Sequence, residues 1–149
     1  MEGLQMGSKH AVIIGAGGHA VSVAESVRSA GYELLGFAST DQYGSTLLGL
    51  PVTAEIPADH LGSGGAVIIA IGDNATREAV WTRLLATVAI EQLPAVCHAS
   101  AIIAPSAQLS PGVVVMQGVI VANEARVGVG ALLNTGSILE HESQLGDFA

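Results

Sequence analysis

Residues 103–149 read IAPSAQLSPGVVVMQGVIVANEARVGVGALLNTGSILEHESQLGDFA, and this stretch decides the fold. An aliphatic residue recurs at every sixth position: Ile103, Leu109, Val115, Val121, Val127, Leu133, Leu139 and Leu145. Four places after each stands a small or β-branched residue: Ala107, Val113, Val119, Ala125, Ala131, Ser137, Ser143 and Ala149. A helix would need apolar spacings of three to four residues, and a simple strand a spacing of two. A period of six predicts a hexapeptide β-helix, in which three hexads form a triangular coil around stacked aliphatic side chains. An irregular β sandwich is the alternative.

The residues before this stretch alternate between strand-like and helix-like patterns. Strands are expected at 11–14, 32–38 and 66–71, helices at about 18–30 and 74–86, and a turn at 39–45. Short apolar runs of this kind are typical of buried parallel strands, and the alternation predicts a small parallel sheet covered by helices. We therefore expect a disordered or tag-like segment over 1–9, a half-Rossmann α/β domain over 10–96 and a parallel β-helix over 97–149.

Composition and charge exclude several classes of protein. Five Lys and Arg against 13 Asp and Glu give a formal net charge of −8, which would repel the phosphate backbone of a nucleic acid. The longest apolar run, Ala66–Ile71, has six residues, whereas a membrane span needs roughly 20. The single cysteine, Cys97, excludes an internal disulfide and a cysteine-rich zinc site, and the histidines show no metal-type spacing. No apolar signal segment begins the chain, so the cytoplasm is the expected location.

A glycine-rich turn follows the first expected strand and opens the first helix. Gly15-Ala16-Gly17-Gly18-His19-Ala20 fits the pattern G-x-G-x-x-G/A. Glycines let the backbone amides approach a phosphate, and the helix N-terminus adds its dipole. The NAD version of this motif needs an acid at the end of the second strand, where Ser39-Thr40 stand here with Asp41 beyond. The motif therefore favours a nucleotide phosphate over NAD, and a tight turn without a ligand is the alternative.

The strongest expected strand ends in a second polar turn. Gly72, Asp73 and Asn74 follow it, at the edge of the sheet where ligands of open α/β folds bind. Asp73 and Asn74 are candidates for contact with a sugar or base, and capping of the next helix is an equal alternative. Arg77 lies one turn later, where it either reaches a phosphate or lies on a solvated helix face.

Glu140-His141-Glu142 places a histidine between two carboxylates on the outside of the seventh hexad. The carboxylates should stabilise the imidazolium, and one of them should orient the ring as in a catalytic triad. Such a histidine can act as a general base at neutral pH. An exposed surface histidine without a catalytic role is the alternative.

Together these motifs resemble a known family. The chain from about residue 10 to residue 149 is similar to the bacterial sugar acyltransferases that join an N-terminal nucleotide-sugar domain to a left-handed β-helix. These are of the sialic acid O-acetyltransferase and UDP-4-amino-sugar N-acetyltransferase types. The resemblance is carried by VIIGAGGHA, AIGDNATR, the hexads opened by HASAIIAPSAQL, and LLNTGSILEHES.

The resemblance implies a function and a site. It implies a homotrimer that binds acetyl-CoA between neighbouring β-helices and a nucleotide sugar on the N-terminal domain, with no metal. His141 resembles the family's catalytic base and Glu142 its acidic partner. The remaining positions implied to bind substrate are Gly17, Gly18, His19, Ser39, Thr40, Gly72, Asp73, Asn74 and Asn134. The reaction expected is acetyl transfer to an amino or hydroxyl group of a sugar in bacterial surface glycan biosynthesis.

Two departures from the family pattern keep other functions open. Many members carry paired acids where Ser39 and Thr40 stand. Members also continue for several more coils, usually with a further histidine just after the position matching Ala149, so we expect a fragment or truncated product of about two and a half coils. Such a chain would bind a sugar nucleotide yet acetylate poorly. A non-catalytic module that binds nucleotide sugar and trimerises is therefore the main alternative, and a small NAD-dependent oxidoreductase is a third.

Overall fold

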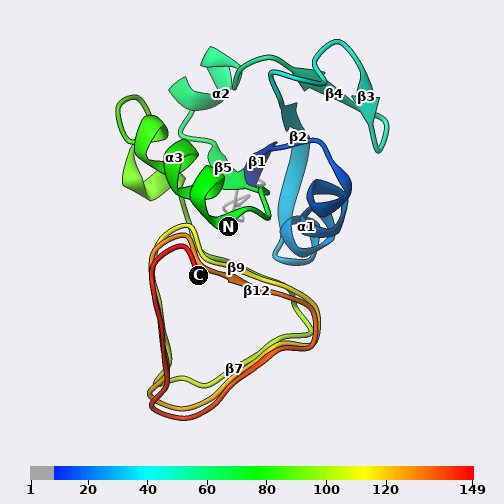
Figure 1. The fold of residues 1–149 in the computed structure, drawn as a ribbon. Coiled ribbons are helices and arrows are strands. Elements are labelled where there is room, and N and C mark those ends of the chain that lie inside the picture. Colours follow the sequence, from blue (N-terminus) through cyan, green and yellow to red (C-terminus); the bar gives the residue numbers. More distant parts are fainter. Residues whose placement is uncertain (1–8) are drawn as a thin grey trace, which may run out of the picture.

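A computed structural model describes residues 9–149 of the chain. A layered α/β part lies against one side of a triangular coil, and the coil runs to the C-terminus (Figure 1). The expected segment over 1–9 lies outside the described residues, except for Lys9. That expectation is wrong for Lys9, because it begins strand β1 (Lys9–Ile14) and pairs with Tyr32.

The α/β part is built on a five-stranded sheet in the order β3-β4-β2-β1-β5. The strands are β1, β2 (Tyr32–Ala38), β3 (Thr46–Leu47), β4 (Leu50–Thr53) and β5 (Ala66–Ile69). All neighbouring pairs are parallel except β3 with β4. After β1 the chain moves outward through β2 to β4 and then returns to the other side of β1 as β5. The strand order therefore reverses between β1 and β5.

The helices follow from local sequence signals. Helix α1 (Gly18–Ser29) buries Val23, Ala24 and Val27 completely, and it ends before Gly31, whose φ of 92° terminates the helix. Helix α3 (Asn74–Leu84) is capped by Asp73. The short elements α2 (Ala58–Gly62), the 3-10 turn η1 (Ile90–Gln92), β3 and β4 were not predicted, because pieces of two to five residues show no period.

The coil confirms the prediction of a left-handed parallel β-helix. It contains two-residue strands on three faces, each face a three-stranded parallel sheet. Partners are eighteen residues apart, as in Ile102, Ile120 and Ile138. The second residue of each strand points inward, and Val115, Val121 and Val127 are almost completely buried. The strands are β6 (Val96–Cys97), β7 (Ile102–Ile103), β8 (Gln108–Leu109), β9 (Val114–Val115), β10 (Ile120–Val121), β11 (Arg126–Val127), β12 (Leu132–Leu133), β13 (Ile138–Leu139) and β14 (Gln144–Leu145).

The coil begins one hexad earlier than the aliphatic repeat, which changes the expected count of coils. Strand β6 pairs with β9, so Cys97 takes the inward position that aliphatic residues take in later hexads. Each face therefore holds three strands, which makes three coils rather than about two and a half. A thiol packs as a small apolar group, and a search for aliphatic residues alone passes over it.

The corners of the coil repeat a backbone conformation that the sequence pattern had not revealed. A positive φ recurs every six residues, at Gly112, Gly118, Glu124, Gly130, Gly136, Glu142 and Phe148. Glycine adopts this left-handed conformation without strain, whereas side-chain-bearing residues do so at a cost. Glu142, a candidate catalytic residue, is therefore held at a strained turn with a φ of 58°.

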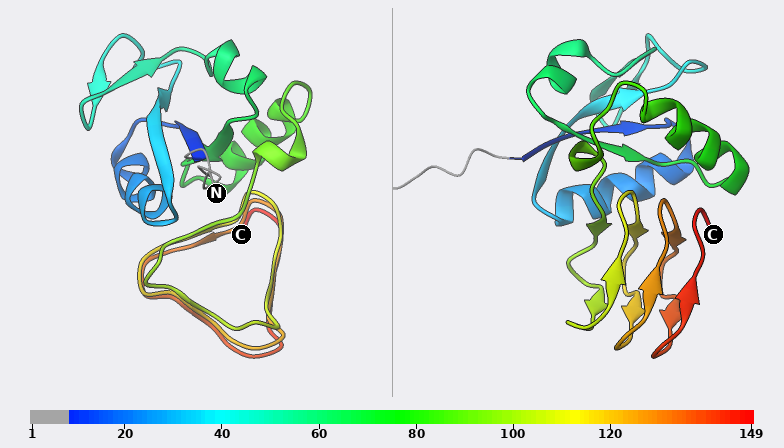
Figure 2. Two further views of the ribbon diagram at one scale, coloured as in Figure 1. Left: turned by 180° about the vertical axis from the view of Figure 1, so that it is seen from behind. Right: turned by 90° about the vertical axis from the view of Figure 1, so that its left-hand side faces the viewer.

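The α/β part and the coil share one continuous hydrophobic core. Helix α1 lies between the sheet and the face formed by β6, β9 and β12 (Figure 2). On that helix Ser26 is fully buried, and its hydroxyl donates to Met116 Sδ of the coil at 3.7 Å. On α3, Trp81 packs edge-on against Phe148 with ring centroids 6.2 Å apart. The joint is therefore a packed interior rather than a flexible linker.

Candidate functional site

The carboxyl ends of β1 and β5 form the first candidate site, because the strand order reverses between them. The turn after β1 is drawn tightly against β5. Gly15 has a φ of 110°, and a Cβ built on it would lie 2.7 Å from the carbonyl oxygen of Ala70. The amide of Gly15 donates to the carbonyl of Ala38 at 2.9 Å. Only glycine fits this position, which explains the first glycine of the motif.

The start of α1 is open to a ligand. Gly17 is the N-cap of the helix and no side chain caps it among the described residues. Gly17 and Gly18 are exposed, and a Cβ at either would meet nothing within 4 Å. The uncapped amides and the helix dipole together favour an anion at this point.

His19 lies at the edge of this opening and is partly buried. Burial, and then the positive charge of Arg77, lower the pKa of its imidazole below the ordinary value of 6.5. The ring is therefore neutral at pH 7 and can offer both a hydrogen-bond donor and an acceptor.

Asp73 and Asn74 form the opposite wall, after β5. The Asp73 carboxylate accepts from the amide of Thr76 at 2.8 Å and from its hydroxyl at 2.6 Å. These two hydrogen bonds lower the pKa of Asp73, and they make it the cap of α3. The amide oxygen of Asn74 accepts from Arg77 at 2.8 Å. Both side chains therefore have structural partners, and their contact with a substrate stays a prediction.

Both readings of Arg77 from the sequence are wrong. Its side chain is only 3% exposed, so it does not lie on a solvated helix face. The nitrogens of its guanidinium all donate to oxygens of the β5 turn and of the coil, so no N–H is left for a phosphate. The helix pattern could not reveal this, because the coil partners lie 53 to 72 residues further along the chain.

Ser39 and Thr40 follow β2, the neighbour of β1, and so lie at the same edge of the sheet. The amide of Ser39 donates to the carbonyl of Thr53 at 2.8 Å, and Thr40 is exposed. The sequence-predicted positions at 17–19, 39–40 and 72–74 are therefore brought to one edge of the sheet.

His141 and Glu142 form a second candidate site on a corner of the coil. His141 Nδ1 and Glu142 Oε2 are 3.2 Å apart, and the two side chains are 65% and 67% exposed. The Glu142 amide donates to the carbonyl of Asn123 at 3.0 Å, which fixes the corner. When Nδ1–H donates to the carboxylate, the neutral ring keeps Nε2 as a proton acceptor.

A polar groove runs beside this pair along the outside of β8, β11 and β14. Its volume is about 540 Å³. The lining is contributed by equivalent positions of successive coils: Ser106, Gln108, Glu124, Arg126, Glu142 and Gln144. Because Glu142 lines the groove, a molecule lying in it would reach the His141–Glu142 pair.

The structure does not bring all predicted residues together within one chain. Asn134 lies at the corner that precedes β13, and His141 lies at the corner that follows it, so the length of one face separates them. The corner of His141 is also opposite the face that packs on the α/β part (Figure 1). Within one chain, the glycine-rich opening and His141 are therefore on different sides of the molecule.

The sequence matches a known domain family over residues 10–84, the PglD N-terminal domain. The chain belongs to this family. The matched range contains both walls of the opening, including Gly17 and Asp73. No curated protein matches the sequence.

Solved structures resemble this chain over more than the matched domain. A histidine-to-asparagine variant of perosamine N-acetyltransferase from Caulobacter crescentus, in complex with CoA and GDP-perosamine, is 32% identical with a TM-score of 0.80, covering 92% of this chain and 65% of that one. The acetyltransferase domain of PglB from Neisseria gonorrhoeae FA1090, in complex with acetyl coenzyme A, is 29% identical with a TM-score of 0.80, covering 95% and 69%. WeeI from Acinetobacter baumannii AYE, 24% identical with a TM-score of 0.78, shares the fold. The chain thus spans about two thirds of the structures it matches.

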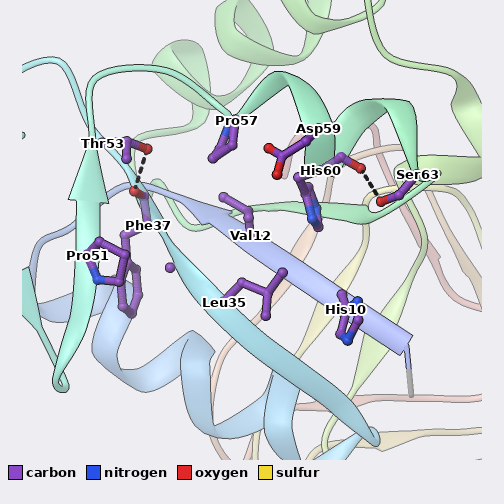
Figure 3. Close-up of a pocket in the computed structure, with 11 residues that line it drawn as sticks. His10, Val12, Leu35, Phe37, Pro51, Thr53, Pro57, Asp59, His60 and Ser63 are labelled. Carbon is purple, nitrogen blue, oxygen red and sulfur yellow. Dashed lines mark hydrogen bonds between the residues drawn. The ribbon is translucent and has the colours of Figure 1, made fainter. Parts of the chain in front are cut away.

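The α/β part also carries a groove that the sequence did not predict. It lies on the sheet beside α2 and has a volume of about 460 Å³ (Figure 3). Val12, Leu35 and Pro51 contribute apolar surface, and Asp59 and Ser63 contribute polar groups. No local motif marks it, because its lining comes from three strands and a helix.

Two further observations concern metals and membranes. Over residues 9–149, no group of three or more His, Cys, Asp or Glu side chains is placed to hold a metal ion. In the same range, no helix has the length and apolar character needed to cross a membrane.

Proposed function

We propose that this protein takes part in acetyl transfer from acetyl-CoA to an amino or hydroxyl group of a nucleotide-activated sugar, in the cytoplasm and in bacterial surface glycan synthesis. The observation that carries the proposal is the combination of two sites in one fold. An uncapped helix N-terminus opens at the strand-order reversal, and a His–Glu pair borders a groove on the coil. Similar structures were solved with CoA and GDP-perosamine, or with acetyl coenzyme A.

The nucleotide sugar is assigned to the opening at the carboxyl ends of β1 and β5. Its phosphates would accept from the backbone amides at Gly17 and Gly18, where no side chain competes for these donors among the described residues. This explains how a chain with a net charge of −8 would hold an anion. Neutral His19 would add a hydrogen bond without adding charge.

His141 is assigned the role of general base. Glu142 holds the ring through Nδ1, so that Nε2 would take a proton from the sugar amine or hydroxyl as that group attacks the thioester carbonyl. The carbon–sulfur bond then breaks, and the proton held by His141 passes to the sulfur, so that coenzyme A leaves as the thiol and the ring is neutral again. Both substrates stay bound at once, and no covalent enzyme intermediate is needed.

A complete site would need more than one copy of the chain. Asn134 and His141 lie at opposite ends of the β13 face, and the nucleotide opening faces another side. The face between the two corners carries a ladder of aligned isoleucines, of which Ile102 is 64% and Ile138 60% exposed. Exposed apolar ladders mark association surfaces. A homotrimer would cover this ladder and bring the His141 corner of one copy to the Asn134 corner of the next.

An activity assay with three variants tests the role of His141. Purified chain is mixed with acetyl-CoA and GDP-perosamine or a UDP-4-amino sugar, and release of the CoA thiol is followed. His141→Ala should reduce turnover by about 100-fold or more, the scale of general-base catalysis. Glu142→Gln should reduce it less, and Glu140→Gln, which keeps the Nδ1 partner, should leave it near normal. Near-normal turnover by His141→Ala would end this assignment.

The separation of the two sites within one chain also favours the second candidate, a non-catalytic module that binds nucleotide sugar and trimerises. Isothermal titration distinguishes the two functions. Heat with the nucleotide sugar and none with acetyl-CoA supports the module, whereas heat with both ligands together with thiol release supports the transferase. No heat with any nucleotide sugar contradicts both.

A further inference from the structure

Arg77 is the most completely hydrogen-bonded side chain of the described residues, and the proposed function assigns it no role. It projects from α3 into the joint between the α/β part and the coil, where it is 3% exposed. Nε donates to the carbonyl of Gly130 at 2.7 Å. Nη1 donates to the carbonyls of Ile71 at 2.9 Å and Gly72 at 3.2 Å.

The remaining nitrogen, Nη2, also has acceptors in both the α/β part and the coil. Nη2 donates to Asn74 Oδ1 at 2.8 Å, to the carbonyl of Phe148 at 2.8 Å and to the main-chain oxygen of Ala149 at 3.3 Å. Three acceptors therefore belong to the turn after β5, at Ile71, Gly72 and Asn74. The other three belong to one corner of the coil.

Such an arrangement needs a reason, because a buried cation held mainly by uncharged oxygens is costly. Burial lowers the pKa of Arg77 and the charge of Asp73 opposes this, but a guanidinium remains charged at all ordinary pH values. A hydrophobic residue would join α3 to the coil with no desolvation cost. It would not, however, orient the carbonyls of residues 71 and 72 and the side chain of residue 74, to which Arg77 donates hydrogen bonds.

We propose that Arg77 is a positioning residue that holds the turn Gly72–Asn74 in the shape that receives the nucleotide sugar and ties that shape to the coil corner at Gly130 and Phe148. The inference rests on the proposed function. It predicts coupling in both directions: a nucleotide bound at the turn stabilises the docked coil, and the docked coil raises nucleotide affinity. The rigid planar fork of the guanidinium suits this role, because it reaches both sets of oxygens at once.

Nucleotide affinity in two Arg77 variants tests the proposal. UDP, GDP and dTDP are titrated calorimetrically into the full chain, and the one that binds is used throughout. Arg77→Met should bind it about tenfold to 100-fold more weakly, as expected for lost charge-assisted hydrogen bonds that act on the ligand site. Arg77→Lys should fall between, because an ammonium keeps the charge but not the fork. The matched control is Arg83→Met, an exposed arginine on the same helix, which should bind as the parent does.

Hydrogen exchange on the parent chain gives a second test of the coupling, and this test requires no variant. The amides of Gly130 and Phe148 donate to the carbonyls of Pro111 and Val129. Bound nucleotide should slow their exchange by about threefold or more, while the amides of Glu142 and Ser143 at the remote corner keep their rates. A merely structural Arg77 would leave exchange at both corners unchanged by nucleotide.

The outcomes separate this inference from the function on which it rests. Parent-like nucleotide affinity in folded Arg77→Met overturns the positioning role and leaves the proposed function standing. If Arg77→Met does not fold, exchange decides: slowing confined to the near corner supports the coupling, and equal or absent slowing refutes it. A parent chain that binds none of the three nucleotides contradicts the proposed function, and the inference falls with it.

Discussion

Replacing Gly112 by alanine tests how tightly α3 is docked on the coil. Gly112 lies at a corner with a φ of 74°, and a Cβ built there would contact Cζ3 of Trp81, with Cε3 and Cη2 both 3.1 Å away. Trp81 is buried and belongs to the helix that also carries Arg77. The added methyl group can be accommodated only if the indole moves out of its packing against Phe148.

The expected loss of stability has two parts. The left-handed backbone costs an alanine about 1–2 kcal/mol relative to glycine. Overpacking against the indole adds about 1–3 kcal/mol. Gly136→Ala isolates the first part, because Gly136 has a φ of 71° and open space within 4 Å. Gly112→Ala should therefore destabilise the protein by about 2–5 kcal/mol and Gly136→Ala by about 1–2 kcal/mol.

The assay uses the single tryptophan of the chain, Trp81, which lies at the joint. Urea unfolding is followed by its fluorescence and by far-UV circular dichroism. Gly112→Ala should also change the emission of the folded protein, whereas Gly136→Ala should not. If the two variants differ by less than about 0.5 kcal/mol in free energy of unfolding, the docking of Trp81 against the corner is not as described.

Three further predictions address pH, the coil interior and assembly. The pKa of His19 is lowered in the folded state, so its contribution to stability is complete above pH 6.5 and is lost as the pH falls below 6.5 toward the folded pKa. Between pH 7.5 and pH 5.5, the urea midpoint should therefore fall more for the parent than for His19→Gln. Val121→Ala should cost about 2–3 kcal/mol of unfolding free energy, since Val121 is fully buried. Gln108→Ala, at the exposed outward position of β8, should change it by less than about 0.5 kcal/mol, and equal effects would contradict the inward and outward assignment. Ile138→Glu should dissociate a trimer in sedimentation experiments while circular dichroism is unchanged, and an unaltered mass would remove this ladder from the interface.

The coil could be predicted because each of its determinants is local. A hexad fixes one face, and pairing at a distance of eighteen residues then follows from three faces per turn. Leu109 and Val127 therefore meet without any long-range information in the sequence. Cys97 was not recognised as part of the repeat, because its side chain is not aliphatic, although it packs as a small apolar group.

The candidate sites could be predicted from the sequence only where their features are local. The glycine turn at 15–20 has a local signature, and its position follows from the strand that precedes it. The direct pairing of His141 and Glu142 is likewise a matter of adjacent residues. Whether Asn134 and His141 meet is not local, because it depends on which corner each occupies and on what covers the face between them.

Arg77 marks the limit of prediction from this sequence. On a helix whose neighbours Thr76 and Glu78 are exposed, nothing in the spacing distinguishes a buried arginine from a solvated one. Its acceptors in the coil are main-chain oxygens, which every residue has. The residue types at positions 130 and 148 therefore do not indicate the contact. Main-chain acceptors can be recognised only from the path of the backbone.

The joint between the α/β part and the coil holds three of the large or polar buried side chains of this chain. The interior of the coil and the sheet is filled mainly by Ala, Val, Ile and Leu, which suit a narrow cross-section but pack in many similar ways. Trp81, Arg77 and Ser26 instead lie where the α/β part meets the coil, and each makes a contact that depends on direction. Directional contacts at the joint fix one placement of the two halves, which the aliphatic cores alone would leave poorly determined. Under the proposed function, two sites on different copies of the chain would need that fixed placement, since a shift at the joint would move each nucleotide opening relative to each His141 corner.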